Sequence, residues 1–324
     1  MSVVDEMKQK VLCGEQITKE VALCLLDVPL GELTNAANEI RERFCQTGFD
    51  ICTIVNGKSG QCSEDCKYCA QSAHYPTKCT DSYPLLSTEE LVEGARHNKE
   101  QNVLRYSIVT SGKALSDKEI NQVCESISAI RQQVQIEVCV SFGLLKEEQF
   151  LKIKKAGATR VHCNLETSEG FFSEICTTHS YQDKIETLNA AKRAGLSICA
   201  GGILGLGETM EDRIDMVLTA RSLGVLSIPV NVLNPIPGTP YEHNSVLSND
   251  EVCRCIAIFR FLIPQASIRL AGGRGLLPDK GKACFESGAN AAISGDMLTT
   301  SGISMETDMK LLTELGFEVK LCNG

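Results

Sequence analysis

The sequence predicts an α/β fold, a (βα)8 barrel of the TIM type with an N-terminal helical extension. From residue 49 onward, short β-branched runs alternate with longer amphipathic stretches, and the pair repeats eight times. Each unit has the length of a strand and its crossover helix, which is the connection that parallel strands require. With 324 residues and 43% hydrophobic content, the chain is long enough for one large core. A doubly wound sheet is the alternative, but no segment marks a reversal of strand order.

The extension is expected over residues 1–48 and the barrel domain over residues 49–324. Within the extension, apolar residues recur at helical spacing over 17–26 and 32–44, with Pro29 and Gly31 between them. Strands are predicted at 50–56, 103–109, 134–140, 159–166, 196–203, 225–232, 266–271 and 290–295. Helices are predicted at 87–101, 116–131, 146–156, 181–194, 210–223, 248–262, 279–288 and 304–315.

Composition excludes several functional classes. The net charge is −9 without a basic tail, so nucleic acid is not an expected partner. No apolar run reaches the ~20 residues that span a bilayer, and MSVVDEMKQK lacks the apolar core of a secretion signal. We therefore expect a cytoplasmic protein without a membrane partner. In that reducing compartment the 17 cysteines should be free thiols or metal ligands.

The most concentrated chemistry lies in CSEDCKYC, where Cys62, Cys66 and Cys69 fall within eight residues. Thiolate-rich sites of this kind favour iron–sulfur clusters or zinc. Three thiolates on a 4Fe–4S cluster leave one iron open to a small molecule, whereas structural zinc usually takes four protein ligands. A zinc knuckle with a distant fourth ligand remains the alternative. The triplet follows the first predicted strand, which places it at the mouth of the barrel.

The predicted strands carry polar side chains on their inward faces. Because side chains alternate along a strand, parity separates barrel-lining from helix-facing positions. The inward set contains Arg105, Ser107, Glu137, Cys139, Ser141, Arg160, His162, Asn164, Glu166, Ser197, Cys199, Ser227, Asn231, Ser267 and Arg269. Burying these groups in an empty barrel would be costly, so a polar ligand or metal cluster inside is expected. Cys139 and Cys199 then become ligands of a second cluster, although small buried filler is the alternative for each.

A glycine-rich turn over 201–208 ends the fifth strand and opens a helix. Glycines there permit a ligand to approach the backbone closely. A dinucleotide fingerprint is the weaker interpretation, because the expected acidic ribose partner is missing from the following strand. The turn is more typical of a nucleoside-binding turn at a barrel mouth.

Together these motifs resemble the radical S-adenosylmethionine (SAM) superfamily, and within it the biotin synthase family. The resemblance spans about residues 40–315 and rests on CSEDCKYC, VHCNLETS, TTHSYQDKIETL, AGGILGLGET, IPVNVL with PGTP, IRLAGGR and LTT. The cysteine triplet identifies the superfamily. The combination of NLETS, TTHSYQ and IRLAGGR points to the biotin synthase family.

The resemblance implies a role for each matching residue. Cys62, Cys66 and Cys69 hold a 4Fe–4S cluster, and SAM chelates the open iron. Tyr68 packs on the adenine and Glu166 takes the ribose. Further residues implied to lie around SAM are Gly202, Ile203, Gly205, Glu208 and Lys184, the last where the family usually has arginine. Residues implied to line the dethiobiotin site are Asn164, Asn231, Thr299 and Thr300.

The implied activity is that of a sulfurtransferase. One electron from flavodoxin or ferredoxin cleaves SAM, the resulting radical takes hydrogen from dethiobiotin, and an auxiliary iron–sulfur cluster donates the sulfur. An iron–sulfur assembly system and a homodimer are also implied. Two alternatives stay open. One is a related radical enzyme of the hydrogenase-maturation or methylornithine type, and the other is a non-catalytic iron–sulfur scaffold.

The auxiliary cluster departs from the family pattern of three cysteines and one arginine. Cys139, Cys199 and Arg269 match three positions, but Ser107 replaces the remaining cysteine, and a hydroxyl is a poor substitute for a thiolate. Parity points Cys52 inward on the neighbouring strand, so we expect it to supply the missing thiolate. Cys163 is expected on the helix-facing side. A 2Fe–2S cluster is usual in the family, and a four-iron variant is the alternative here.

Overall fold

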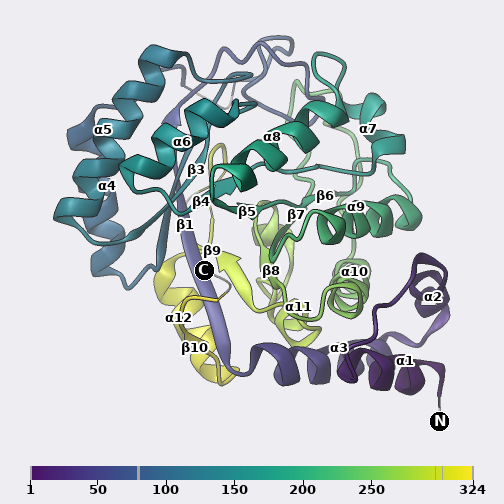
Figure 1. Cartoon of the computed structure of the whole chain (residues 1–324). Helices are drawn as coiled ribbons and strands as arrows, with labels where there is room; N and C mark the ends of the chain where they lie inside the picture. The colour runs from purple at the N-terminus through teal and green to yellow at the C-terminus, as the bar shows by residue number, and fades with distance from the viewer. Residues whose placement is uncertain (1, 79–80, 296, 301, 323–324) are drawn as a thin grey trace.

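Strand pairing closes the predicted barrel. The computed structural model describes residues 2–78, 81–295, 297–300 and 302–322 (Figure 1). Its barrel strands are β1 (Gly48–Lys58), β2 (Arg105–Thr110), β3 (Glu137–Ser141), β4 (Arg160–His162), β5 (Ser197–Cys199), β6 (Gly202–Leu204), β7 (Ser227–Val232), β8 (Ser267–Leu270) and β9 (Ala291–Ile293). All pair in parallel, and β1 pairs with both β2 and β9. Because β5 pairs with β4 while β6 pairs with β7, these two short strands act as one bent strand that completes the ring. The (βα)8 prediction is confirmed.

Helices surround the strands, as Figure 1 shows. The crossover helices are α4 (Thr88–Glu100), α5 (Asp117–Gln133), α6 (Glu147–Ala156), α8 (Tyr181–Arg193), α9 (Met210–Ser222), α10 (Asn249–Leu262), α11 (Lys282–Glu286) and α12 (Met305–Glu314). Local sequence sets their starts: Ser87 and Ser116 form capping boxes with Glu90 and Glu119, which satisfy the first free amides. The pattern did not predict α7 (Glu169–Ile175), the short 3-10 helix η2 (Arg274–Leu276) or β10 (Glu318–Val319).

The N-terminal extension packs on one side of the barrel. It contains α1 (Val3–Leu12), α2 (Lys19–Cys24), the 3-10 helix η1 (Leu25–Asp27) and α3 (Leu30–Cys45). Contacts join α3 to α10 and α2 to α9. Arg254 of α10 donates to the carbonyls of Leu26 and Val28 at 3.1 and 2.8 Å. The buried side of α3 belongs to the same hydrophobic core as the barrel strands. The division into an extension over residues 1–48 and a barrel domain over residues 49–324 stays a prediction.

The amino end of the barrel is closed by the C-terminal segment. Strand β10 pairs with the start of β1, joining Gly48 to Glu318. The ring of Phe49 packs edge-on against Phe285 and Phe317, with centroids 5.0 and 5.1 Å away. Access to the interior is therefore expected from the opposite end, at the carboxyl ends of the strands. In the described part of the chain, each helix is too short or too polar to cross a membrane.

Candidate active site

A cavity of about 420 Å³ occupies the barrel interior and its mouth. It is lined by inward-facing strand residues and by the loop that follows β1. The predicted site residues on its wall are Cys52, Cys62, Cys66, Tyr68, Cys69, Cys139, Asn164, Glu166, Lys184, Cys199, Ile203, Asn231, Arg269, Thr299 and Thr300. The parity argument is confirmed for Arg105, Ser107, Arg160 and His162, which line the same space. The cavity wall does not include four other members of the predicted inward set, Glu137, Ser197, Ser227 and Ser267.

The loop of the cysteine triplet folds back on itself at the mouth. The amide of Cys62 donates to the carbonyl of Gln71 at 3.0 Å, and Ala73 returns a bond to the Cys62 carbonyl at 2.8 Å. Inside this loop the Cys69 amide donates to the Cys66 carbonyl at 3.0 Å. Burial raises the pKa of the Cys69 thiol to about 11, so this sulfur is neutral at pH 7 until a cation binds. All three cysteines of the triplet line the cavity, as an iron–sulfur site requires.

Asp65 fastens this loop to the segment after α7. Burial opposes its ionisation, but bonds from the amides of Thr177 (2.8 Å) and Thr178 (3.1 Å) and from their hydroxyls keep its pKa well below the usual range. The Lys67 amide adds a bond to the Ile175 carbonyl at 2.9 Å. The triplet loop is therefore fixed both by the barrel and by the segment that follows α7.

Deeper in the barrel, Cys52, Cys139 and Cys199 form an inner set of thiols. Arg269 Nη1 donates to the Cys52 sulfur at 3.2 Å. Burial raises the pKa of Cys139 to about 12. Burial acts the same way on Cys199, but a bond and charge from His162 with two nearby guanidinium groups outweigh it and lower its pKa to about 7. The surroundings of Cys199 therefore favour a thiolate.

Positive charge dominates this inner chamber. The guanidinium groups of Arg105, Arg160 and Arg269 are 2–3% exposed, and Asp50 is fully buried among them. Asp50 pairs with Arg269 Nη2 at 3.0 Å and with Arg105 Nε at 3.2 Å. Within the described residues, Arg105 Nη2 has no hydrogen-bond partner. The free donor of Arg105 and the nearby guanidinium groups suit the chamber to an anionic group bound through the inner thiols.

Glu166 carries an unused acceptor at the cavity wall. Its backbone is left-handed, with φ of 72°, a strained conformation for a residue with a side chain. Lys184 Nζ lies 3.8 Å from its Oε1, while the buried Oε2 finds no hydrogen-bond partner among the residues that the structure describes. A ligand with hydroxyl donors would satisfy this oxygen, and the ribose of a nucleoside has such donors.

Two family models match the chain. Residues 58–220 match the radical SAM superfamily, and residues 229–318 match the biotin and thiamin synthesis associated domain. The chain is 55% identical to biotin synthase from Brachyspira hyodysenteriae (strain ATCC 49526 / WA1), covering 98% of this chain and 95% of that protein. It is 56% identical to biotin synthase 2 from Corynebacterium diphtheriae (strain ATCC 700971 / NCTC 13129 / Biotype gravis), covering 99% and 97%. The chain belongs to the biotin synthase family. It is thus an enzyme of the radical SAM superfamily.

Solved structures agree at the level of the fold. Methylornithine synthase superposes with a TM-score of 0.84 over 97% of both chains, at 18% identity. The FeFe-hydrogenase maturase from Carboxydothermus hydrogenoformans gives a TM-score of 0.83, covering 99% of this chain and 80% of that one, also at 18% identity. The alternative of a methylornithine-type or maturase-type enzyme therefore has support from the fold alone, whereas the full-length sequence match is to biotin synthases.

The amides predicted to contact substrate also support the barrel rim. Asn164 Oδ1 accepts a bond from the Gly201 amide at 3.2 Å. Asn231 donates to the Gly202 carbonyl at 3.0 Å and accepts from the Gly272 amide at 2.9 Å. In this biotin synthase family member, these side chains bond to the backbone of neighbouring barrel segments, so their substitution would affect packing as well as any contact with substrate.

Gly202, Gly205 and Glu208, predicted to border SAM, do not line the cavity. A Cβ on Gly202 would lie 2.2 Å from the Met216 sulfur and 2.3 Å from the Glu166 carbonyl oxygen, so the glycine is required by packing. Glu208 is buried in an ion pair with Arg213 Nε at 2.6 Å. These residues shape the turn, while Ile203 between them reaches the cavity wall.

The two alternative cysteines lie in different surroundings. Cys52 packs in a small cluster with Ala271 and Ile293, next to Arg269. The expectation that Cys163 faces the helices is wrong, because it reaches the cavity wall while also packing within the main hydrophobic core. Strand β4 ends at His162, so the alternation of side chains does not extend to Cys163. The inward direction predicted for Cys52 is confirmed. Which cysteine binds iron remains a prediction.

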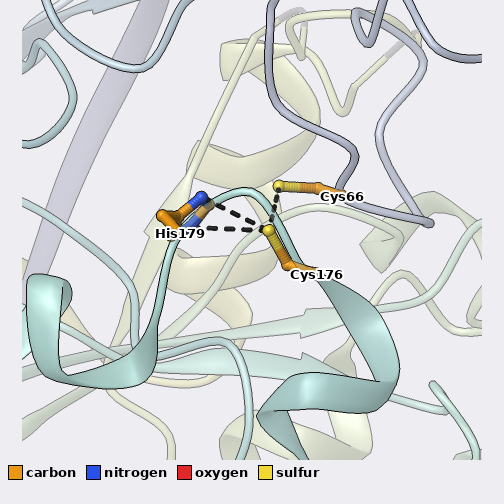
Figure 2. Close-up of side chains that lie close together, drawn as sticks. All are labelled: Cys66, Cys176 and His179. Atoms are coloured by element: carbon orange, nitrogen blue, oxygen red, sulfur yellow. Dashed lines mark hydrogen bonds between the residues drawn. The ribbon is translucent and has the colours of Figure 1, made fainter.

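Sequence reasoning missed several residues of the site. Asp50 shares the inward parity of Cys52, and this signal could have identified it as the buried counter-ion. His179 lies within TTHSYQ and Cys176 directly precedes it, but neither has a recognisable spacing toward the triplet. The fold brings them next to Cys66 in the triplet loop (Figure 2).

Proposed function

We propose that this chain inserts sulfur into dethiobiotin, using SAM and a 4Fe–4S cluster at Cys62, Cys66 and Cys69, with an auxiliary iron–sulfur cluster in the inner chamber. When bound, the first cluster with SAM supplies a carbon radical that can abstract hydrogen from an unactivated C–H bond, and the auxiliary cluster supplies sulfide. The observation that carries the proposal is that both sets of thiols face one cavity. A substrate held between them could meet both.

The residues around the outer set bind and orient SAM. The Glu166 carboxylate, with its unused oxygen, accepts bonds from the ribose hydroxyls. Lys184, 3.8 Å from Glu166, adds a buried positive charge beside the mouth. Tyr68, between the triplet cysteines, supplies an aromatic surface on the cavity wall for the adenine.

The inner chamber holds the auxiliary cluster through Cys52, Cys139 and Cys199. Arg269 lies beside them, and its bonds to the Asp50 and Ala292 carbonyls, at 2.9 and 3.0 Å, fix its guanidinium group in place. The donor set fits an iron–sulfur group, because thiolates are soft ligands and the guanidinium groups of Arg105 and Arg269 beside them favour an anionic cluster. Asn164, Asn231, Thr299 and Thr300 contact dethiobiotin between the two sets.

The test is an anaerobic incubation of the reconstituted chain with SAM, dethiobiotin and a reductant, with flavodoxin or ferredoxin as the proposed electron donor. Biotin and 5′-deoxyadenosine are the expected products. Deoxyadenosine without biotin would favour a related radical enzyme, and neither product would favour a scaffold. Cys69→Ala should abolish both products. Cys253→Ala is a matched control, since it removes a buried thiol outside the cavity. The homodimer and the iron–sulfur assembly partner are part of the same proposal.

A further inference from the structure

A second metal-binding geometry is built around the middle cysteine of the triplet. Cys66, Cys176 and His179 bring their ligand atoms within 4.8 Å of one another (Figure 2). Cys66 comes from the loop after β1, and the other two come from the segment after α7. Nothing in the proposed reaction uses Cys176 or His179.

The distances match a tetrahedral zinc site. Zinc–sulfur bonds of about 2.3 Å place two thiolates about 3.8 Å apart, and the sulfurs of Cys66 and Cys176 are 3.7 Å apart. The same geometry puts a zinc-bound sulfur and an imidazole nitrogen about 3.5 Å apart. The His179 nitrogens lie 3.3 Å (Nδ1) and 3.9 Å (Nε2) from the Cys176 sulfur. Only small side-chain shifts separate this arrangement from a bound ion.

The surroundings orient the imidazole as metal sites commonly do. Glu64 Oε2 lies 2.7 Å from His179 Nδ1, and both side chains are less than 10% exposed. A carboxylate that binds one ring nitrogen leaves the other nitrogen free to ligate, which is the usual second shell of a zinc-bound histidine. The Cys176 thiol donates to Asp65 Oδ1 at 3.2 Å, and an ion would displace that proton while the Thr177 amide continues to bind Asp65.

We propose that the cluster-free chain binds one Zn²⁺ through Cys66, Cys176 and His179, with the fourth position open to solvent. Two thiolates and an imidazole form a donor set that favours zinc over the harder divalent ions. Because Cys66 also belongs to the triplet, this ion and the 4Fe–4S cluster exclude each other. The site therefore makes cluster assembly sensitive to zinc.

The test uses the full chain, freed of clusters and kept anaerobic, with Co²⁺ as the spectroscopic probe. The wild type should bind one Co²⁺ with the intense visible bands of a tetrahedral thiolate site, and one equivalent of Zn²⁺ should displace it. Cys176→Ala should weaken binding more than about 100-fold, because losing a ligand costs more than the 10–100-fold loss typical of an outer-shell partner. Glu64→Gln should weaken it about 10- to 100-fold.

Cys253→Ala is the matched control, since its sulfur is also 3.7 Å from a second thiol, that of Cys284. It should bind Co²⁺ as the wild type does. Wild-type affinity in Cys176→Ala would overturn the proposal, because the triplet alone would then hold the ion. An equal loss in Cys253→Ala would also overturn it.

X-ray absorption at the zinc edge removes any dependence on how the variants fold. The wild type should show two sulfur ligands and one imidazole, and a shell of three sulfurs without imidazole would refute the assignment. A final experiment rests on the proposed function of Cys66 as a ligand of the 4Fe–4S cluster. One equivalent of Zn²⁺ should prevent iron uptake at the triplet in the wild type but not in Cys176→Ala. Since the zinc measurements need neither SAM nor dethiobiotin, their outcome is independent of the proposed activity.

Discussion

Replacing Cys52 by alanine tests the ligand set of the auxiliary cluster. The change removes one of three inner thiolates, which should weaken the cluster more than the ~100-fold upper range for an outer-shell partner, or more than about 2.8 kcal/mol. The surrounding protein should keep its structure, because Arg269 loses its 3.2 Å contact with sulfur but retains Asp50 and Ala292. Iron should fall from about six or eight atoms per chain to about four, leaving the triplet cluster.

The control is Cys163→Ala, which makes the same chemical deletion at a similarly buried position, 8% exposed against 6% for Cys52. It should retain the iron and sulfide of the wild type after anaerobic reconstitution, measured by colorimetric analysis of both elements. If Cys163→Ala loses the inner iron and Cys52→Ala keeps it, the assignment from strand parity is wrong. If both keep it, Cys52 is buried filler and Ser107 is tolerated in the site.

The remaining predictions concern charge. Asp50→Asn leaves buried guanidinium groups without their carboxylate, so it should lower the unfolding free energy of the cluster-free chain by about 3–5 kcal/mol. The measurement is the urea midpoint of unfolding, which should fall. An unchanged midpoint would contradict the ion pairs at 3.0 and 3.2 Å. Glu166→Gln should raise the Kd for SAM about 10- to 100-fold in equilibrium dialysis, with the triplet iron unchanged. Burial opposes ionisation of Glu119, but Lys58 at 2.7 Å and hydrogen bonds from Ser116 lower its pKa from 4.5 to about 2. The stability from this lowered pKa is present above pH 4.5 and is lost as the pH falls toward 2, so Glu119→Gln should lower the Tm at pH 7 but not near pH 2.

Much of the fold could be predicted because local signals agree with it. Each barrel strand is a short β-branched run followed by a capped amphipathic helix. Hydrophobic periodicity and capping residues therefore predict the same order of strands and helices. The bend that splits β5 from β6 was not visible, because it depends on Gly201 and Gly202 packing against neighbouring backbone and side chains. Helix α7 was missed because seven residues are too few to show a helical period.

The candidate site could likewise be predicted only in part. Parity along single strands predicted which cysteines and arginines face inward, since alternation is a local property. The pairing of Asp50 with Arg269, far along the chain, depends on strands that meet only when the barrel closes. The contact between Cys66 and Cys176 likewise joins residues 110 positions apart. Local sequence patterns cannot predict contacts between residues so far apart in the chain.

The strand register shows that exchanging Ser107 and Cys52 is not a like-for-like substitution. Ser107 pairs with Ile54, whereas Cys52 pairs with Arg105. A thiol at Cys52 therefore lies two residues, or about 6.6 Å along the strand, closer to the closed end of the barrel than a thiol at position 107 would. That displacement brings the sulfur within 3.2 Å of Arg269, the buried ion-pair partner of Asp50. We therefore expect a larger auxiliary cluster than the usual 2Fe–2S form, because a group held by Cys52, Cys139 and Cys199 would have to extend toward those charges.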